Sequence, residues 1–404
     1  MKTIIVALVF MYLHISYSQW ESVNLGVPDD VSKIEFVDDN TGFLVSRTTL
    51  LKTTNQGVNW VFIPVPSVGA MLDVSFPNQG TGYICANSGG RFLKTTDGGN
   101  NWSLMYTNIP NFGQYSIDFN NANTGFIAGG WGNPSSTSII KTTNGGLTWT
   151  VQLLSAAFFH QVKMINNQEV IACGDKVFRT NNGGVSWNEI AFTHTFNFYD
   201  VYFNNNIGYM VSEGTSIGFP SVYRSSNYGV TWEATQLTGG ERLLGVHFLN
   251  ESYGFVCGFG GIYRTSNNGQ NWTRDTITTL MRSIGGNSSY LFAGGFQGSI
   301  YRTTNPIGIV QISAVVPEVF SLSQNYPNPF NPTTQIEFTV AKNEFVKITV
   351  FDVTGRVMEK LVNEDLNTGT YKVDFNADSY SSGIYFYRLE TDGYSETKKM
   401  VLLK

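Results

Sequence analysis

A nine-residue pattern recurs along this chain and limits the folds open to it more than any other feature. Its copies read KTTNQGVNW (52–60), KTTDGGNNW (94–102), KTTNGGLTW (141–149), RTNNGGVSW (179–187), RSSNYGVTW (224–232) and RTSNNGQNW (264–272). A seventh copy begins at Arg302 as RTTNPIG but has no tryptophan. From Lys52 to Arg302 the copies are spaced by about 42 residues on average. A catalytic constellation normally occurs once in a chain, so this pattern indicates a repeated structural unit.

Two short segments stand before each copy. The first alternates polar and apolar residues, as in DVSF (73–76) and DVYF (200–203), and the second combines an aromatic residue with glycine, as in TGYICA (81–86). Alternation at a period of two residues, with Asn and Gly between the segments, predicts four strands in each repeat. Four-stranded repeats of about 40 to 50 residues are typical of propellers. The sequence therefore predicts an all-β chain whose main domain is a seven-bladed β-propeller.

The segment QWESV (19–23) resembles the strand that follows each turn, as in NWVFIPV (59–65). Trp20 would then supply the tryptophan that the last repeat lacks. We expect this N-terminal strand to close the ring, because its pairing with the last blade removes exposed sheet edges.

The pattern [ST]-x-[DN]-x-G-x-x-W resembles the Asp-box, or BNR repeat, of sialidases, sortilin-type receptors and related propellers. That resemblance implies a hairpin turn remote from the central site. Asn or Asp in such a turn accepts hydrogen bonds from nearby backbone amides, and glycine tolerates a positive φ. We therefore interpret the following residues as structural: Asn55, Asp97, Asn144, Asn182, Asn227 and Asn267.

The combination of TGF or TGY with KTTNGG-x-TW most closely resembles the propellers related to photosystem II assembly factors, over residues 19–306. Propellers host unrelated activities, so a photosynthetic role is not carried over.

Four blocks near the C-terminus are similar to the type A C-terminal sorting domain of the type IX secretion system: NYPNPFNP (325–332), FDVTGR (351–356), SGIYFYRL (382–389) and KKMVLLK (398–404). Their alternation predicts an immunoglobulin-like β-sandwich over residues 320–404, after a linker at 307–319. The resemblance implies that the secretion machinery and its sortase are partners. It also implies removal of the domain, an anchored or released passenger and a Bacteroidetes-like source.

An export signal is predicted at the N-terminus. Lys2 is followed by an apolar stretch, Ile4 to Leu13, and by the small-x-small site Ser16-Tyr17-Ser18, so residues 1–18 read as a signal peptide. No later stretch has the roughly 18 apolar residues of a membrane span. We therefore expect a protein that passes through the periplasm and is secreted or attached to the outer-membrane surface.

The charge and cysteine content exclude several site types. A net charge of −5 gives no basic stripe, so no nucleic-acid partner is expected. Cys85, Cys173 and Cys257 occupy equivalent repeat positions and read as small buried side chains. With four histidines, His160 and His247 among them, the chain predicts neither a metal site nor a cofactor.

Two functions remain open. The leading one is a noncatalytic binding or scaffolding module for a glycan, peptide or protein. The other is an extracellular glycoside hydrolase or lyase that would use carboxylates on the alternating segments, with Asp73, Asp118 and Asp200 as candidates. Because Asp73 and Asp200 share one repeat position, hydrogen bonding within the blades is the preferred interpretation of these carboxylates.

The loops that lead into each first strand should gather at one mouth of the channel. Side chains there combine aromatic rings with guanidinium groups, which suit sugar rings, carboxylates or aromatic partners. The candidate ligand-binding residues are Tyr115, Phe159, His160, Phe198, Tyr199, Arg242 and Arg282. The alternative is that the aromatic residues pack between blades.

Overall fold

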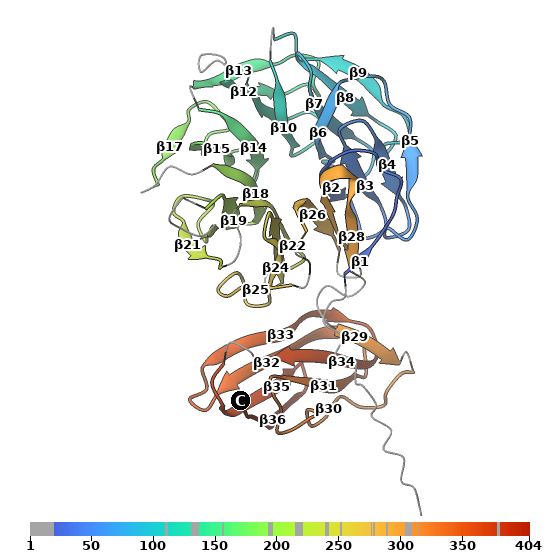
Figure 1. Ribbon diagram of the computed structural model, residues 1–404, viewed down its shortest axis with the longest axis vertical. Coiled ribbons are helices and arrows are strands. Elements are labelled where there is room, and N and C mark those ends of the chain that lie inside the picture. The colour runs from blue at the N-terminus through green and yellow to red at the C-terminus, as the bar shows by residue number, and fades with distance from the viewer. Residues whose placement is uncertain are drawn as a thin grey trace, which may run out of the picture. The chain divides into compact units, whose positions relative to one another are not determined.

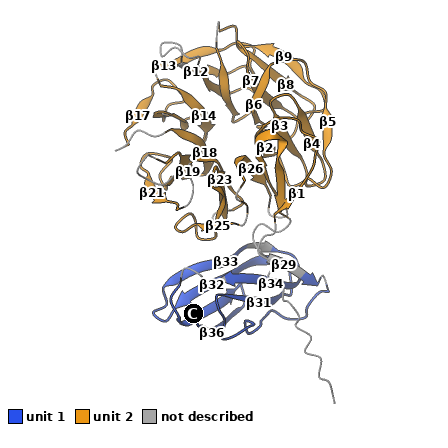
Figure 2. Ribbon diagram, viewed as in Figure 1, with its two compact units in different colours: residues 1–19, 308–404 blue, residues 20–307 orange. Residues whose placement is uncertain are grey.

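The computed structural model describes residues 20–404 apart from 110–111, 131–136, 156, 193–196, 215–220, 239–241, 251–252, 276, 278, 288–289, 304–308, 314 and 378–379. The signal peptide predicted over residues 1–18 lies outside the described residues. The chain forms two compact units, one spanning Trp20–Ile307 and the other Gly308–Lys404 (Figure 2).

The first unit is a ring of seven four-stranded antiparallel sheets, which confirms the predicted propeller (Figure 1). The strands of each blade are given from the channel outward. Blade 1 consists of β2 (Val31–Phe36), β3 (Gly42–Ser46), β4 (Leu50–Thr53) and β5 (Val61–Ile63), and blade 2 of β6 (Ala70–Ser75), β7 (Gly82–Asn87), β8 (Arg91–Thr95) and β9 (Ser103–Tyr106). Blade 3 consists of β10 (Gln114–Phe119), β11 (Gly125–Gly129), β12 (Thr137–Thr142) and β13 (Thr150–Ser155).

Blades 4 to 6 continue the ring in the same order. Blade 4 consists of β14 (Phe159–Met164), β15 (Val170–Gly174), β16 (Val177–Thr180) and β17 (Asn188–Ile190), and blade 5 of β18 (Phe198–Asn204), β19 (Ile207–Ser212), β20 (Ser221–Ser225) and β21 (Glu233–Gln236). Blade 6 consists of β22 (Leu243–Phe248), β23 (Gly254–Gly258), β24 (Gly261–Thr265) and β25 (Thr273–Arg274).

Blade 7 is built from both ends of the unit. It consists of β26 (Met281–Gly286), β27 (Leu291–Gly295), the 3₁₀ turn η1 (Phe296–Gly298), β28 (Ile300–Thr303) and the N-terminal β1 (Glu21–Ser22). Glu21 pairs with Arg302, and the indole Nε1 of the buried Trp20 donates to Asp275 Oδ2 at 3.0 Å. The predicted closure by the N-terminal strand is therefore confirmed.

The hydrophobic core lies between neighbouring blades. The second strands are mainly apolar because both of their faces are covered, and all five residues of Gly42–Ser46 are buried. Phe43 of blade 1 stacks on Phe76 of blade 2 with ring centroids 4.2 Å apart, and Trp102 meets both rings edge-on. One cluster of buried residues thus joins two blades.

Each nine-residue turn is stabilised by its own side chains. Asp97 Oδ1 accepts hydrogen bonds from Thr95 Oγ1 and from the amides of Asn100 and Asn101, at 2.8 to 3.0 Å. The Asn101 side-chain amide also donates to Asp97 Oδ2 at 2.8 Å, and this bond together with the others lowers the pKa of Asp97 to about 2. Gly99 sits at φ +80°, which favours glycine, and its carbonyl accepts from the Trp102 indole.

Turns of successive blades are also linked to one another. Lys52, Lys94 and Lys141 each donate from Nζ to a glycine carbonyl in the next blade's turn, at 2.6 to 2.8 Å. In blade 4, Arg179 Nε donates in the same way to Tyr228 O at 2.8 Å. The Lys/Arg position of the repeat therefore has a scaffolding role at these four places.

The second unit packs two four-stranded sheets around one buried core, as expected for the C-terminal region. The sheets have the orders β29 (Ile309–Ser313), β34 (Gly369–Asn376), β31 (Thr333–Val340), β30 (Ser321–Leu322), and β33 (Val357–Leu366), β32 (Glu344–Asp352), β35 (Gly383–Glu390), β36 (Ser395–Leu402). Strand β29 falls within the segment expected to be a linker, so the sandwich begins earlier than residue 320.

Candidate functional site

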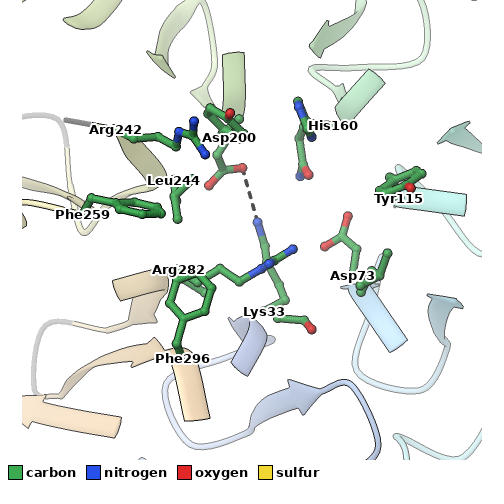
Figure 3. A pocket seen from close by; sticks show the side chains of 15 residues that line it. Lys33, Asp73, Tyr115, His160, Asp200, Arg242, Leu244, Phe259, Arg282 and Phe296 are labelled. Carbon is green, nitrogen blue, oxygen red and sulfur yellow. Dashed lines mark hydrogen bonds and ion pairs between the residues drawn. The ribbon is translucent and has the colours of Figure 1, made fainter. Parts of the chain in front are cut away.

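A pocket of about 360 Å³ lies at one mouth of the propeller channel (Figure 3). Each of the seven innermost strands contributes the same position to its wall. These seven residues are Ser32, Leu72, Tyr115, His160, Tyr199, Leu244 and Arg282. We call them the bulge ring, for the reason given next.

Each member of the bulge ring is an extra residue in its strand pair. In blade 4, Phe159 pairs with Gly174 and Gln161 pairs with Cys173, which leaves His160 without a partner between them. The same shift occurs in all seven inner pairs. A β-bulge of this kind redirects the side chain of its extra residue. Here it directs one residue per blade into the channel.

The bulges also show that two of the residues predicted to bind a ligand are buried in the core. Phe159 and Phe198 are 0% and 2% exposed and belong to the core clusters of their blades. Each precedes a bulge residue, so its side chain packs between blades while the next one faces the pocket. We therefore remove both phenylalanines from the candidate binding surface. Tyr115, His160, Tyr199, Arg242 and Arg282 all line the pocket.

A continuous row of rings follows the pocket wall from blade 3 to blade 5. Tyr115 contacts Phe158 at 4.6 Å between ring centroids, Phe158 contacts His160 at 4.8 Å, and His160 contacts Tyr199 at 4.6 Å. Phe158 joins this row from the loop before β14, and the sequence interpretation had not included it.

The row continues through Arg242 into blades 6 and 7. The guanidinium of Arg242 lies 5.4 Å from the Tyr199 ring and 5.3 Å from that of Phe259, and Phe259 in turn contacts Phe296 at 6.0 Å. Phe259 and Phe296 come from the loops after second strands. Both lie outside the loops before first strands, where the ligand-binding residues were predicted.

Glu213 fixes part of this wall. It pairs with Arg242 Nη2 at 3.1 Å and accepts from the Tyr199 hydroxyl at 3.0 Å. Burial, reinforced by the Glu213 charge, raises the pKa of Tyr199 to about 12. Burial and the nearby Arg282 lower the pKa of His160 to about 4, so its imidazole is neutral at physiological pH.

The carboxylates considered for catalysis are occupied by structural bonds. Asp73 Oδ2 accepts from Ser116 Oγ and from the Ile117 amide of blade 3, at 2.7 and 3.1 Å. Asp118 Oδ2 accepts from the Met164 amide of blade 4 at 2.6 Å, and its Oδ1 accepts from Lys163 Nζ at 2.9 Å. Both side chains thus join neighbouring blades.

Asp200 has the same role and a second partner across the ring. Its Oδ2 accepts from the Val246 amide of blade 6 at 3.1 Å, while Oδ1 accepts from Lys33 Nζ of blade 1 at 3.4 Å. Lys33 and Asp200 each follow a bulge residue, so the pair lies one residue deeper than the bulge ring and crosses the channel beneath it (Figure 3).

In the described part of the chain, no group of three or more His, Cys, Asp or Glu side chains is placed to bind a metal ion. Cys85, Cys173 and Cys257 are buried free thiols, and burial raises the pKa of each. No helix among the described residues has the length and apolar character that a membrane crossing requires.

Both units match known families. Residues 58–188 match the photosynthesis system II assembly factor YCF48 family, and residues 324–403 match the secretion system C-terminal sorting domain. The chain is a YCF48-like propeller joined to a secretion sorting domain. The sorting domain indicates secretion across the outer membrane and implies interaction with the type IX machinery.

One curated relative of this YCF48-like protein is the photosystem II assembly lipoprotein Ycf48 of Synechococcus sp. (strain CC9902). It is 26% identical over 148 residues, which cover 35% of this chain and 42% of the relative. The match thus spans less than half of the relative's length.

Solved structures share the fold. A YCF48 structure with a bound D1 peptide has a TM-score of 0.58 at 18% identity, covering 72% of this chain and 98% of that one. The GH74 xyloglucanase of Xanthomonas campestris has a TM-score of 0.57 at 10% identity, covering 79% of this chain and 59% of that one.

Proposed function

We propose that this protein is a secreted, noncatalytic binding module that holds an extracellular ligand at the mouth of its propeller channel. The observation that carries this function is the bulge ring. Seven separate strands each place one irregular residue in the same pocket, and such bulges are over-represented next to functional sites. A concave site with aromatic walls and a few polar groups is the usual form of a ligand pocket.

The fold relatives support a binding role and leave two ligand types open. The YCF48 structure was solved with a peptide, and the Xanthomonas protein is a xyloglucanase. Both peptides and glycans are therefore in the range of partners for this fold.

The alternative function, a glycoside hydrolase or lyase, is disfavoured by the state of the carboxylates. Asp73 and Asp200 border the pocket, and burial raises the pKa of Asp73. However, Asp73 Oδ1 accepts from the Val74 amide, and its Oδ2 already has two donors. Three of the roughly four acceptor positions of the Asp73 carboxylate are thus taken by structural bonds, which disfavours a role on a glycosidic bond or a water molecule.

Export completes the proposal. The type IX machinery would deliver the protein from the periplasm, and its sortase would remove the sorting domain and leave the propeller on the outer-membrane surface or in the medium. The sorting-domain match supports this route.

Calorimetry against panels of oligosaccharides and peptides, with product analysis of the same mixtures, tests the function. We expect saturable binding without products, weakened by Tyr115→Ala. Product formation that is lost in Asp73→Asn would instead establish an enzyme.

A further inference from the structure

The Arg282 guanidinium is a charged group in the wall of the pocket. It projects into the middle of the pocket (Figure 3). Within the described residues it forms no hydrogen bond or ion pair, whereas Lys33 is paired with Asp200 and Arg242 with Glu213. Burial and the charge of Arg47 lower the pKa of Arg282, and the Asp30 carboxylate, which is paired with Arg47, offsets this only in part. Such a group is balanced when a ligand supplies an anion.

The surroundings of Arg282 supply further unused hydrogen-bonding groups. The Gln161 amide and the His160 imidazole line the pocket without a hydrogen-bond partner for their side chains in the described chain. The neutral imidazole offers one donor and one acceptor. A ligand with one anionic group and several hydroxyls would use all three side chains.

Backbone amides of three inner strands beside this pocket are already hydrogen-bonded to side chains of neighbouring blades. The Ile34 amide donates to Ser283 Oγ, the Ile117 amide to Asp73, and the Val162 amide to Ser116 Oγ, at 2.9 to 3.1 Å. Peptides that add a strand need such an edge. The observed bonds therefore disfavour strand addition, and side-chain recognition of this kind suits a sugar.

The depth of the pocket determines how much of a ligand can enter it. The Lys33–Asp200 pair crosses the channel below the bulge ring, so a polymer cannot pass through it at this level. A chain end or a projecting ring fits, with the faces of Tyr115 and Tyr199 beside it.

We propose that the pocket binds a carboxylated sugar, a uronic acid at the end of an acidic glycan, whose carboxylate pairs with the Arg282 fork. The planar guanidinium matches a carboxylate in bidentate geometry. The sugar hydroxyls bind Gln161 and His160. This inference rests on the proposed binding function and names its ligand class.

Calorimetry with trigalacturonic acid, its methyl ester and a hexapeptide with a free C-terminus tests the inference. We expect the acid to bind and its neutral methyl ester to bind at least tenfold more weakly. Arg282→Gln should weaken binding of the acid at least tenfold, and Arg282→Lys should weaken it less because the charge remains. Arg91→Gln is the matched control, since Arg91 is exposed and does not line the pocket. Thermal unfolding checks that each variant is folded.

The outcomes separate the two proposals. Equal binding of acid and ester, or equal losses in Arg282→Gln and Arg91→Gln, overturns the carboxylate contact while the binding function stands. Binding of the peptide alone overturns the sugar class and also leaves the function standing. Absence of binding by all three probes overturns the carboxylated-sugar inference, and if the wider panels are also silent the binding function fails with it.

Discussion

Lys33 of blade 1 and Asp200 of blade 5 form an ion pair across the channel, with 3.4 Å between Nζ and Oδ1. Their blades are not neighbours in the ring, so the pair ties together parts of the propeller that no strand pairing connects. The Asp200 charge offsets the effect of burial on Lys33 and helps to keep the lysine pKa raised.

Substitution of one partner should show how much this ion pair stabilises the propeller. Lys33→Met leaves Asp200 without a counter-ion, and we expect a loss of about 2 to 3 kcal/mol in the free energy of unfolding. This lies below the range for fully buried pairs because the two side chains are 25% and 10% exposed. Asp200→Asn keeps an acceptor for the Val246 amide. In urea titrations the double variant should be more stable than Lys33→Met, and strict additivity would contradict the coupling.

Ring closure depends on Trp20. Trp20→Ala removes a buried ring that seals blade 7 and should lower the free energy of unfolding by about 3 to 5 kcal/mol. Asp97→Ala disturbs one exposed turn and should cost less. Denaturant titration compares the two variants, and similar small losses would show that the N-terminal strand contributes little.

Substitutions at Phe159 and Tyr115 test whether the bulges separate buried core residues from residues that face the pocket. Phe159→Ala should cost about 3 kcal/mol or more in stability, because its ring is fully buried. Tyr115→Ala, Tyr199→Ala and Arg242→Ala should each weaken ligand binding by about 1 kcal/mol or more with little change in melting temperature. The reverse pattern, with Tyr115 critical for stability, would place the aromatic row in the core.

Glu35 should make the propeller less stable as the pH rises. Burial raises its pKa to about 7 from an ordinary value of 4.5, opposed by Lys163 and the Phe76 amide and reinforced by Asp73 and Asp118. Between these two values the folded protein retains a proton that the unfolded chain has lost, so this contribution falls from pH 4.5 to pH 7 and then levels off. Relative to the wild type, Glu35→Gln should gain about 3 kcal/mol between pH 4 and pH 8. A pH-independent difference between the two proteins would contradict this role.

Deletion of residues 309–404 should abolish secretion and leave a folded propeller in the periplasm, because the sandwich that starts at β29 carries the sorting-domain match. Cell fractionation with a proteolysis assay follows both properties. Wild-type levels of the truncated protein at the surface would contradict this prediction.

The sequence predicts the blades well because each repeat encodes its own turn and strands. Thr95, Asp97 and Trp102 interact within a few residues of one another, so their role can be read locally. The pocket could be predicted only in part. A bulge shifts the alternation of inward and outward side chains by one residue, and the seven bulge residues have no common side-chain type that would mark them. The sequence therefore could not tell which of Phe159 and His160 faces the pocket. Strand β29 was missed because its partner, β34, lies about sixty residues later in the chain.

In each blade the bulge assigns stability and ligand recognition to different, adjacent residues. The residue on either side of each bulge pairs with the neighbouring strand, whereas the bulge residue makes no ladder contact and is Ser, Leu, Tyr, His or Arg in different blades. Most of these seven side chains can therefore be exchanged while the ring keeps its architecture, although Ser32 also donates to the Met71 carbonyl of blade 2. Ligand preference can thus change one position at a time during evolution or in a designed library, with coupling between neighbours in contact such as His160 and Tyr199.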